Sequence, residues 1–242
     1  MDSRQNTRHH PAVVLIGPTG AGKTPLGQLL ESRGLWGRRC VHFDFGAQLR
    51  SVAAITQTDP QSNAAGPEEF TSQQIDFIRD VLARGALLED QHFPLAKKIL
   101  LRFLARSCPD SDTWVLLNGL PRHAGQAEKI AELLDVKAVI ELRCTAETVL
   151  ERIRTNIGGD RMARQDDDIQ SIAQRLATYH QRTAPLVEYY RKQGVPIVSV
   201  AVGPQTTAEQ LWESVQRGPV DLPSGDAPGR SAATGTVRQH RQ

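Results

Sequence analysis

The chain has 242 residues and a formal net charge of +2, from 29 lysines and arginines against 27 aspartates and glutamates. This length suits one α/β core with a small subdomain, and the balanced charge argues against an extended nucleic-acid surface, which needs a strongly basic stripe. Cys40, Cys108 and Cys144 lie far apart and form no C-x-x-C pair, which argues against a zinc knuckle or a disulfide framework. No stretch has the length of a membrane span or the pattern of a secretory signal, so we expect a cytoplasmic monomer with reduced thiols that binds neither nucleic acid nor membrane.

The first predicted element is a phosphate-binding unit. The apolar run Val13–Ile16 leads into residues 17–24, whose spacing matches G-x-x-x-x-G-K-[ST]. In this motif glycines let backbone N–H groups surround the phosphates, the lysine reaches the terminal phosphates, and the final hydroxyl serves Mg²⁺. A helix over about 22–32 adds its positive dipole end to the same place; the alternative is a chance glycine-rich turn. The residues predicted to bind ATP are Gly17, Pro18, Thr19, Gly20, Ala21, Gly22, Lys23 and Thr24, with Thr24 as the candidate Mg²⁺ ligand.

Strands and helices then alternate along the chain. Strands are expected at 40–43, 113–117, 138–142 and 197–202, and helices at 49–55, 70–82, 94–105, 124–134, from about 146, at 168–193 with a break near Pro185, and at 207–216. We expect a loose arm at 1–11, a loop at 56–67, an exposed excursion at 156–165 and a disordered tail at 218–242.

This alternation predicts a parallel sheet with helices on both faces. Ligands of such sheets bind at the carboxyl ends of the strands. Three marked segments, Gly17–Thr24, Asp44–Arg50 and Asn118–Arg122, follow predicted strands. We therefore expect them to converge on one cleft.

Several motifs in the same order resemble the adenylate kinase family of nucleoside monophosphate kinases, over about Val13 to Trp212. They are Phe45-Gly46-Ala47-Gln48-Leu49-Arg50, similar to Thr-Gly-Asp-x-Leu-Arg; Gly85 to Asp90, similar to Gly-x-Leu-Val-x-Asp; Leu117 to Arg122 with Gln126, similar to Asp-Gly-Phe-Pro-Arg and Gln; and Arg164 to Asp167, Arg175-Leu176 and Tyr179 to Leu186. The resemblance implies the three-layer α/β fold of P-loop NTPases, with a five-stranded parallel sheet, a monophosphate-binding insertion at about 44–90, and a short zinc-free lid at about 154–165.

The activity that the resemblance implies is ATP + AMP = 2 ADP, with Mg²⁺. Transfer between two nucleotides brings many phosphate charges together, so guanidinium groups that clamp phosphates are expected to dominate. For any one arginine the alternative is an exposed solubilising charge. The implied catalytic residues are Lys23, Arg122, Arg152, Arg164 and Arg175, with Arg152 also on the ATP side; the implied monophosphate-binding residues are Phe45, Arg50, Leu88, Gly119, Arg122, Gln126, Arg164 and Arg175.

The sequence departs from the family pattern at two positions near the expected metal and at one position of the expected acceptor site. Asn118 and Ala47 stand where the family has aspartates, and Phe45 replaces a threonine. The chain therefore lacks two carboxylates that, by resemblance to the family, would hold hydrated Mg²⁺. We expect weaker metal binding, and we expect Asn118→Asp to raise the rate of phosphoryl transfer. These departures keep two alternatives open: a catalytically weak nucleotide-binding sensor, and a P-loop kinase for another small acceptor.

Overall fold

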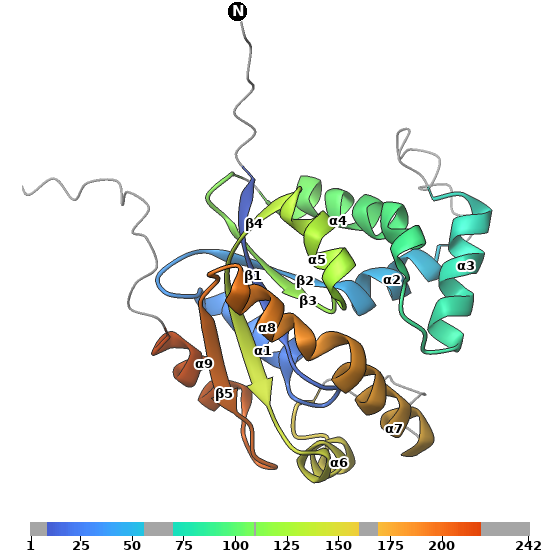
Figure 1. The fold of residues 1–242 in the computed structure, drawn as a ribbon. Helices are drawn as coiled ribbons and strands as arrows, with labels where there is room; N and C mark the ends of the chain where they lie inside the picture. Colours follow the sequence, from blue (N-terminus) through green and yellow to red (C-terminus); the bar gives the residue numbers. More distant parts are fainter. Residues whose placement is uncertain (1–8, 56–69, 109, 160–168, 219–242) are drawn as a thin grey trace, which may run out of the picture.

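The computed structural model describes residues 9–55, 70–108, 110–159 and 169–218. Its sheet has five strands in the order β2-β3-β1-β4-β5, and every neighbouring pair is parallel (Figure 1). The strands are β1 (His10–Ile16), β2 (Cys40–Asp44), β3 (Trp114–Asn118), β4 (Leu134–Arg143) and β5 (Ile197–Ala201). The predicted five-stranded α/β fold is confirmed.

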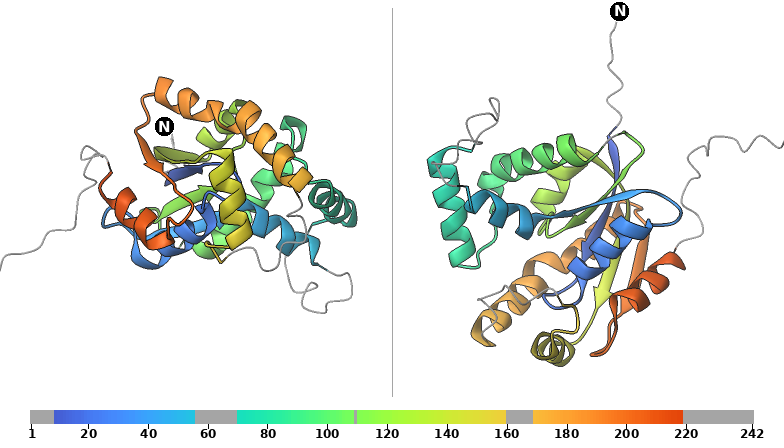
Figure 2. Two further views of the ribbon diagram at one scale, coloured as in Figure 1. Left: turned by 90° about the horizontal axis from the view of Figure 1, so that it is seen from below. Right: turned by 180° about the vertical axis from the view of Figure 1, so that it is seen from behind.

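Helices cover both faces of this sheet (Figure 2). They are α1 (Lys23–Arg33), α2 (Phe45–Ala53), α3 (Ser72–Ala83), α4 (Phe93–Ser107), α5 (Ala124–Ala131), α6 (Ala146–Thr155), α7 (Ile169–Thr178), α8 (Pro185–Lys192) and α9 (Ala208–Gln216), with a short 3₁₀ turn at Asp90–His92. Alternate residues of a strand point to opposite faces. Val14 of β1 accordingly packs in the cluster with α4, α5 and α8, whereas Val13 packs with α1 and α9. The sheet is therefore buried on both sides.

Several segment boundaries differ from the sequence-based prediction, and those of β1 and α5 have a common cause. β1 begins at His10, inside the predicted arm, because it pairs with Leu134 at the start of β4. The helix predicted over 124–134 ends at Ala131. Leu134, 1% exposed, continues the apolar spacing of that helix but joins the sheet instead. Pairing with β1 therefore overrides the helical pattern.

The long helix predicted over 168–193 is broken into three parts, as the proline suggested. Between α7 and α8 lies a π-helical turn, η3 (Tyr179–Thr183), in which Ala184 N donates to Tyr179 O at 2.8 Å. Pro185 has no N–H to offer to a normal helical bond, so the chain restarts there as α8. π turns of this kind commonly mark functional regions.

Helix α9 is tied to the loop between α1 and β2 by four side-chain bonds. Trp36 donates from its backbone N to Gln216 Oε1 and from its indole Nε1 to Val215 O, both at 2.9 Å. Gln216 Nε2 and Trp212 Nε1 both donate to Gly34 O, at 2.9 and 3.3 Å. Helix α9 is therefore fixed against the carboxyl end of α1.

Several predictions fall on segments outside the described residues: the loop at 56–67, Arg164 with most of the lid, and the tail beyond Gly218. Cys40 is buried, Cys108 and Cys144 are half-buried, and all three are free thiols, as expected. No described helix combines the length and apolar character needed to cross a membrane.

Candidate active site

One cavity of about 210 Å³ lies where β1, β2 and β3 end. Leu15, Asp44 and Asn118, from the carboxyl ends of these strands, all line it. The three segments that the sequence placed at strand ends therefore meet, as expected for a parallel sheet. The basic side chains that line the cavity are Lys23, Arg50, Arg122 and Arg175.

The phosphate loop has the backbone geometry that its glycines allow. Gly20 and Gly22 have φ values of +76° and +95°, which favour glycine. Lys23 folds back over the loop, and its Nζ donates to Gly17 O at 2.7 Å and to Pro18 O at 2.8 Å. The side chain therefore lies directly over the space that the loop encloses. Of the predicted ATP-binding residues, Gly17, Thr19, Gly20, Gly22, Lys23 and Thr24 line the cavity, and Pro18 and Ala21 do not.

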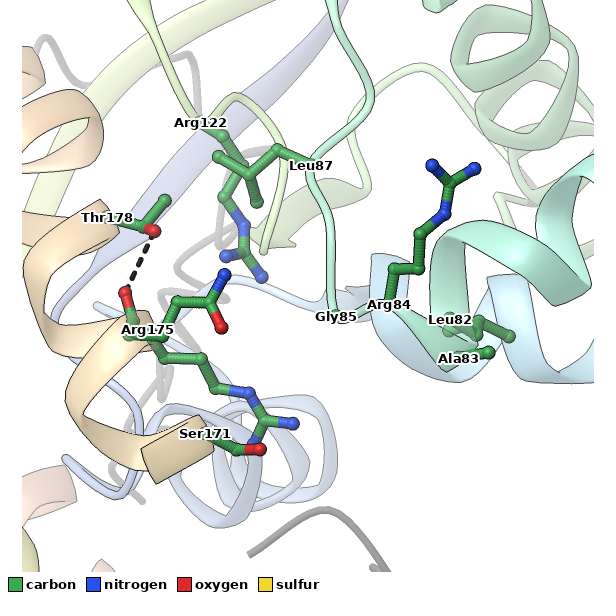
Figure 3. Close-up of a pocket in the computed structure, with 10 residues that line it drawn as sticks. Leu82, Ala83, Arg84, Gly85, Leu87, Arg122, Ser171, Arg175 and Thr178 are labelled. Carbon is green, nitrogen blue, oxygen red and sulfur yellow. Dashed lines mark hydrogen bonds between the residues drawn. The ribbon is translucent and has the colours of Figure 1, made fainter. Parts of the chain in front are cut away.

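Arg122 and Arg175 also border a smaller cavity of about 80 Å³ beside the first one. Figure 3 shows both side chains extending toward the space between α7 and residues 84–87. Arg122 is held from two sides: its Nε donates to Gly119 O at 3.0 Å, and its carbonyl accepts from Thr183 Oγ1 at 3.0 Å. Because Thr183 belongs to η3, the π turn helps to position this arginine.

Arg152, predicted to act on the donor, lies elsewhere. It is 3% exposed and does not line either cavity. Its Nε donates to Gly20 O at 3.0 Å, and its Nη1 donates to Gly203 O at 2.9 Å and to Thr206 O at 2.7 Å. In this arrangement Arg152 joins the phosphate loop to the turn after β5 and does not reach into the phosphate site.

The residues predicted to contact the acceptor base are buried behind the cavity wall. Gln126 is 1% exposed, and its amide bridges two backbone groups: Nε2 donates to Leu88 O at 2.7 Å, and Oε1 accepts from Arg122 N at 2.8 Å. Leu88 and Phe45 belong to the apolar core. The wall beside Arg50 is formed instead by Val81, Leu82, Gly85, Ala86 and Leu87.

Asp44 is a cavity residue that the sequence-based list of sites missed. It ends β2, where Thr24 Oγ1 donates to its Oδ2 at 2.8 Å and Asn118 Nδ2 donates to the same oxygen at 3.1 Å. Burial alone would raise the pKa of Asp44, but the bonds from Ala47 N and the Thr24 hydroxyl outweigh it and keep the pKa below its ordinary value. The carboxylate is therefore charged. Its place directly after an apolar strand was the available signal.

His42 lies behind this group on the same strand. Its Nε2 is 3.4 Å from Asn118 Nδ2. Burial lowers the pKa of His42, against the opposing charges of Asp44 and Glu31, so the imidazole is neutral at physiological pH. The ring occupies space that α1 leaves open at Gly27, where any Cβ would overlap it.

Among residues 9–55, 70–108, 110–159 and 169–218, no three His, Cys, Asp or Glu side chains cluster as a metal site.

A family model described as adenylate kinase matches residues 70–195. The adenylate kinase of Parvibaculum lavamentivorans is 32% identical over 194 residues, which span 75% of this chain and 80% of that protein. The adenylate kinase of Rhodopirellula baltica is 33% identical over 190 residues, spanning 76% of this chain and 83% of that protein. The chain belongs to the adenylate kinase family. The resemblance inferred from its motifs is thereby confirmed.

Membership of the adenylate kinase family supports a nucleoside monophosphate kinase. The adenylate kinase of Thermobifida fusca, 30% identical, aligns over 79% of this chain and 90% of its own length. These alignments cover most of each protein. This adenylate kinase family member nevertheless has a carboxylate at Asp44 and an amide at Asn118 at the ends of the paired strands β2 and β3.

Proposed function

We propose that this protein transfers the γ-phosphoryl group of ATP to a nucleoside monophosphate. The proposed acceptor is AMP, which gives two molecules of ADP. The observation that carries the proposal is the cavity at the strand ends, which Lys23, Arg50, Arg122 and Arg175 all line. In the reaction an acceptor phosphate oxygen forms the new bond to the γ-phosphorus, and the bond to the β,γ-bridging oxygen breaks with its electron pair left on ADP. Phosphoryl transfer of this kind depends mainly on positioning and charge neutralisation.

The donor phosphates are proposed to bind in the loop of Gly17–Thr24. The backbone N–H groups of the loop and the N-terminus of α1 favour an anion there. Lys23 Nζ, which bonds to Gly17 O and Pro18 O, would exchange these carbonyls for the β- and γ-phosphates. The carbonyls hold the ammonium group over the loop, so only a short movement is needed.

The acceptor phosphate is proposed to bind Arg50 and Arg122, with Arg175 near the transferring group. Arg122 is well placed for this, because Gly119 O holds its Nε beside the cavity and a guanidinium group pairs with phosphate through two parallel hydrogen bonds. Arg164, which lies outside the described residues, is proposed by family resemblance to complete the set.

Mg²⁺ is the proposed cofactor, and the residues present fit it. Mg²⁺ takes oxygen ligands, and the Thr24 hydroxyl and the Asp44 carboxylate lie together on the cavity wall. When bound with ATP, the ion would supply positive charge that offsets the negative charge of the phosphates. The Thr24 hydroxyl would serve as an oxygen ligand of the ion beside the phosphate loop.

AMP is proposed as the acceptor because the relatives are named adenylate kinases. A second candidate is another small acceptor. The specific observation in its favour is Gln126, whose amide would have to leave Leu88 O and Arg122 N before it could contact a base. The two candidates differ in the substrate that reacts fastest.

The test is a set of initial rates with ATP and each of AMP, GMP, CMP and UMP. We expect AMP to give the highest kcat/KM. Lys23→Ala should abolish turnover and leave the melting temperature unchanged, whereas Lys97→Ala, at an exposed position of α4, should leave both unchanged. An analogue joining two adenosines through a phosphate chain should stabilise the wild type against unfolding. Stabilisation by this analogue without turnover of any monophosphate would favour a sensor instead.

A further inference from the structure

Asp44 has the wrong charge for a residue that only contacts phosphate. Among the described residues that line the main cavity it is the one acidic side chain, whereas Lys23, Arg50, Arg122 and Arg175 line the same cavity with positive charge. ATP and a monophosphate bring further negative charge to this cavity. A half-buried carboxylate at such a place is favourable when a cation lies between it and the phosphates.

Capping of α2 does not account for the position of Asp44. The cap uses one oxygen, because Oδ1 accepts from Ala47 N at 2.9 Å. Serine, threonine or asparagine could do the same. The other oxygen, Oδ2, points to Thr24 Oγ1 at 2.8 Å, across 20 positions of sequence. This second contact belongs to the phosphate site.

The hydrogen-bond pattern fixes how Thr24 and Asn118 are oriented. The one hydroxyl hydrogen of Thr24 goes to Asp44, and Asn118 Nδ2 donates to Thr24 Oγ1 at 3.1 Å, so one lone pair of the hydroxyl remains. Asn118 must present its nitrogen to Asp44, because its oxygen would repel the carboxylate. Asp44 accepts three bonds in all, which leaves acceptor capacity on its carboxylate.

We propose that Asp44, together with Thr24, is the metal-facing group of this site, and that Asn118 is a positioning residue that orients the Asp44 carboxylate. This inference rests on the proposed function, since the metal enters with ATP. The pairing of β2 with β3 sets Asp44 directly opposite Asn118, so the carboxylate and its amide donor are adjacent in the sheet. The carboxylate missing at Asn118 and Ala47 is supplied from the neighbouring strand end.

The arrangement adds an expectation for the stability of Asn118→Asp. This substitution replaces an amide that donates to Asp44 Oδ2 by a second carboxylate at the same separation, 3.1 Å. The two like charges repel without a metal, so the variant should unfold at a lower temperature. A divalent cation between the carboxylates should recover most of that loss.

The experiment uses Mn²⁺ and a non-hydrolysable ATP analogue, with free Mn²⁺ measured by electron paramagnetic resonance. Asp44→Asn is expected to weaken Mn²⁺ binding in the ternary complex on the order of tenfold or more. Binding of the analogue in EDTA should be unchanged or tighter, because a negative charge has been removed. Exchanging the residues in Asp44→Asn/Asn118→Asp should restore at least part of the Mn²⁺ affinity. Asp135→Asn, at an exposed position near the amino end of β4, serves as the matched control.

Wild-type Mn²⁺ affinity in Asp44→Asn would overturn the inference and leave the proposed function intact. Failure of the wild type to bind the analogue, with or without Mn²⁺, would instead remove the proposed function and the inference with it. If Asp44→Asn does not fold, the melting temperature of Asn118→Asp decides. A lowered melting temperature that returns toward the wild-type value when Mn²⁺ and the analogue are added supports the inference. An equal lowering with and without Mn²⁺ and the analogue contradicts it.

Discussion

Replacing Arg152 by alanine should damage stability before it damages chemistry. The guanidinium is 3% exposed and donates to the carbonyls of Gly20, Gly203 and Thr206. Each buried carbonyl left without a partner costs about 1–3 kcal/mol, and such costs do not add fully, so we expect a loss of roughly 3–5 kcal/mol. For a domain of this size that corresponds to a fall of roughly 6–20 °C in Tm.

The assay is thermal unfolding of Arg152→Ala with and without ATP, together with kcat and the KM for ATP. We expect a lower Tm and a raised KM, because the phosphate loop loses its tie at Gly20 O, with a smaller change in kcat. Arg154→Ala is the control, since this exposed neighbour on α6 bonds only to Glu151 among the contacts described, and its Tm should match the wild type. A wild-type Tm combined with a lost kcat in Arg152→Ala would show that Arg152 acts on the phosphates directly.

Three further results are expected. Gly27→Ala should destabilise the protein by about 1–2 kcal/mol in urea unfolding, because the overlap of the new Cβ with His42 outweighs the better helix propensity of alanine. In the double variant with His42→Ala this loss should be relieved. Additive losses of the two single substitutions in the double variant would contradict the explanation. Burial raises the pKa of Cys40 to about 12, so this thiol should resist alkylation near pH 8 until the chain unfolds; alkylation at the rate of a free thiol would refute the assignment. The pKa of Glu89 is lowered, mainly by the hydrogen bond from Arg182. The ion pair therefore stabilises the fold at pH values above 4.5, the ordinary pKa of glutamate, and this stabilisation is lost as the pH falls through the lowered pKa of the folded state. Arg182→Ala should therefore cost less than about 1 kcal/mol near pH 7, for this half-exposed pair, and the cost should shrink as the pH falls through the lowered pKa of Glu89. A cost that stays constant on acidification would exclude the ion pair as the cause.

The phosphate loop, the strands and most helices could be predicted because their signals are local. An apolar run before a glycine-rich loop determines both the strand and the turn, and the break at Pro185 follows from its missing N–H. The helix predicted to reach residue 134 fails for the opposite reason. Leu134 fits a helical spacing equally well, and only its distant partner His10 assigns it to a strand.

The site was predictable in residue type and less so in geometry. Lys23, Arg50, Arg122 and Arg175 meet in one cavity, because each follows a motif that fixes its place at a strand end or on a neighbouring helix. The orientation of a long side chain depends on carbonyls far away in sequence, such as Thr206 O for Arg152, 54 positions later. A sequence pattern does not carry that information.

The bonds between Trp36 and α9 also order the events of synthesis. Gln216, which accepts from Trp36 N, is synthesised 180 positions after Trp36. Until then, the side of α1 that Leu211 and Val215 cover has no partner, and its apolar residues stay open to water. A chain that stops before α9 therefore leaves this side of the first helix uncovered, so the packing around α1 depends on residues as late as Gln216.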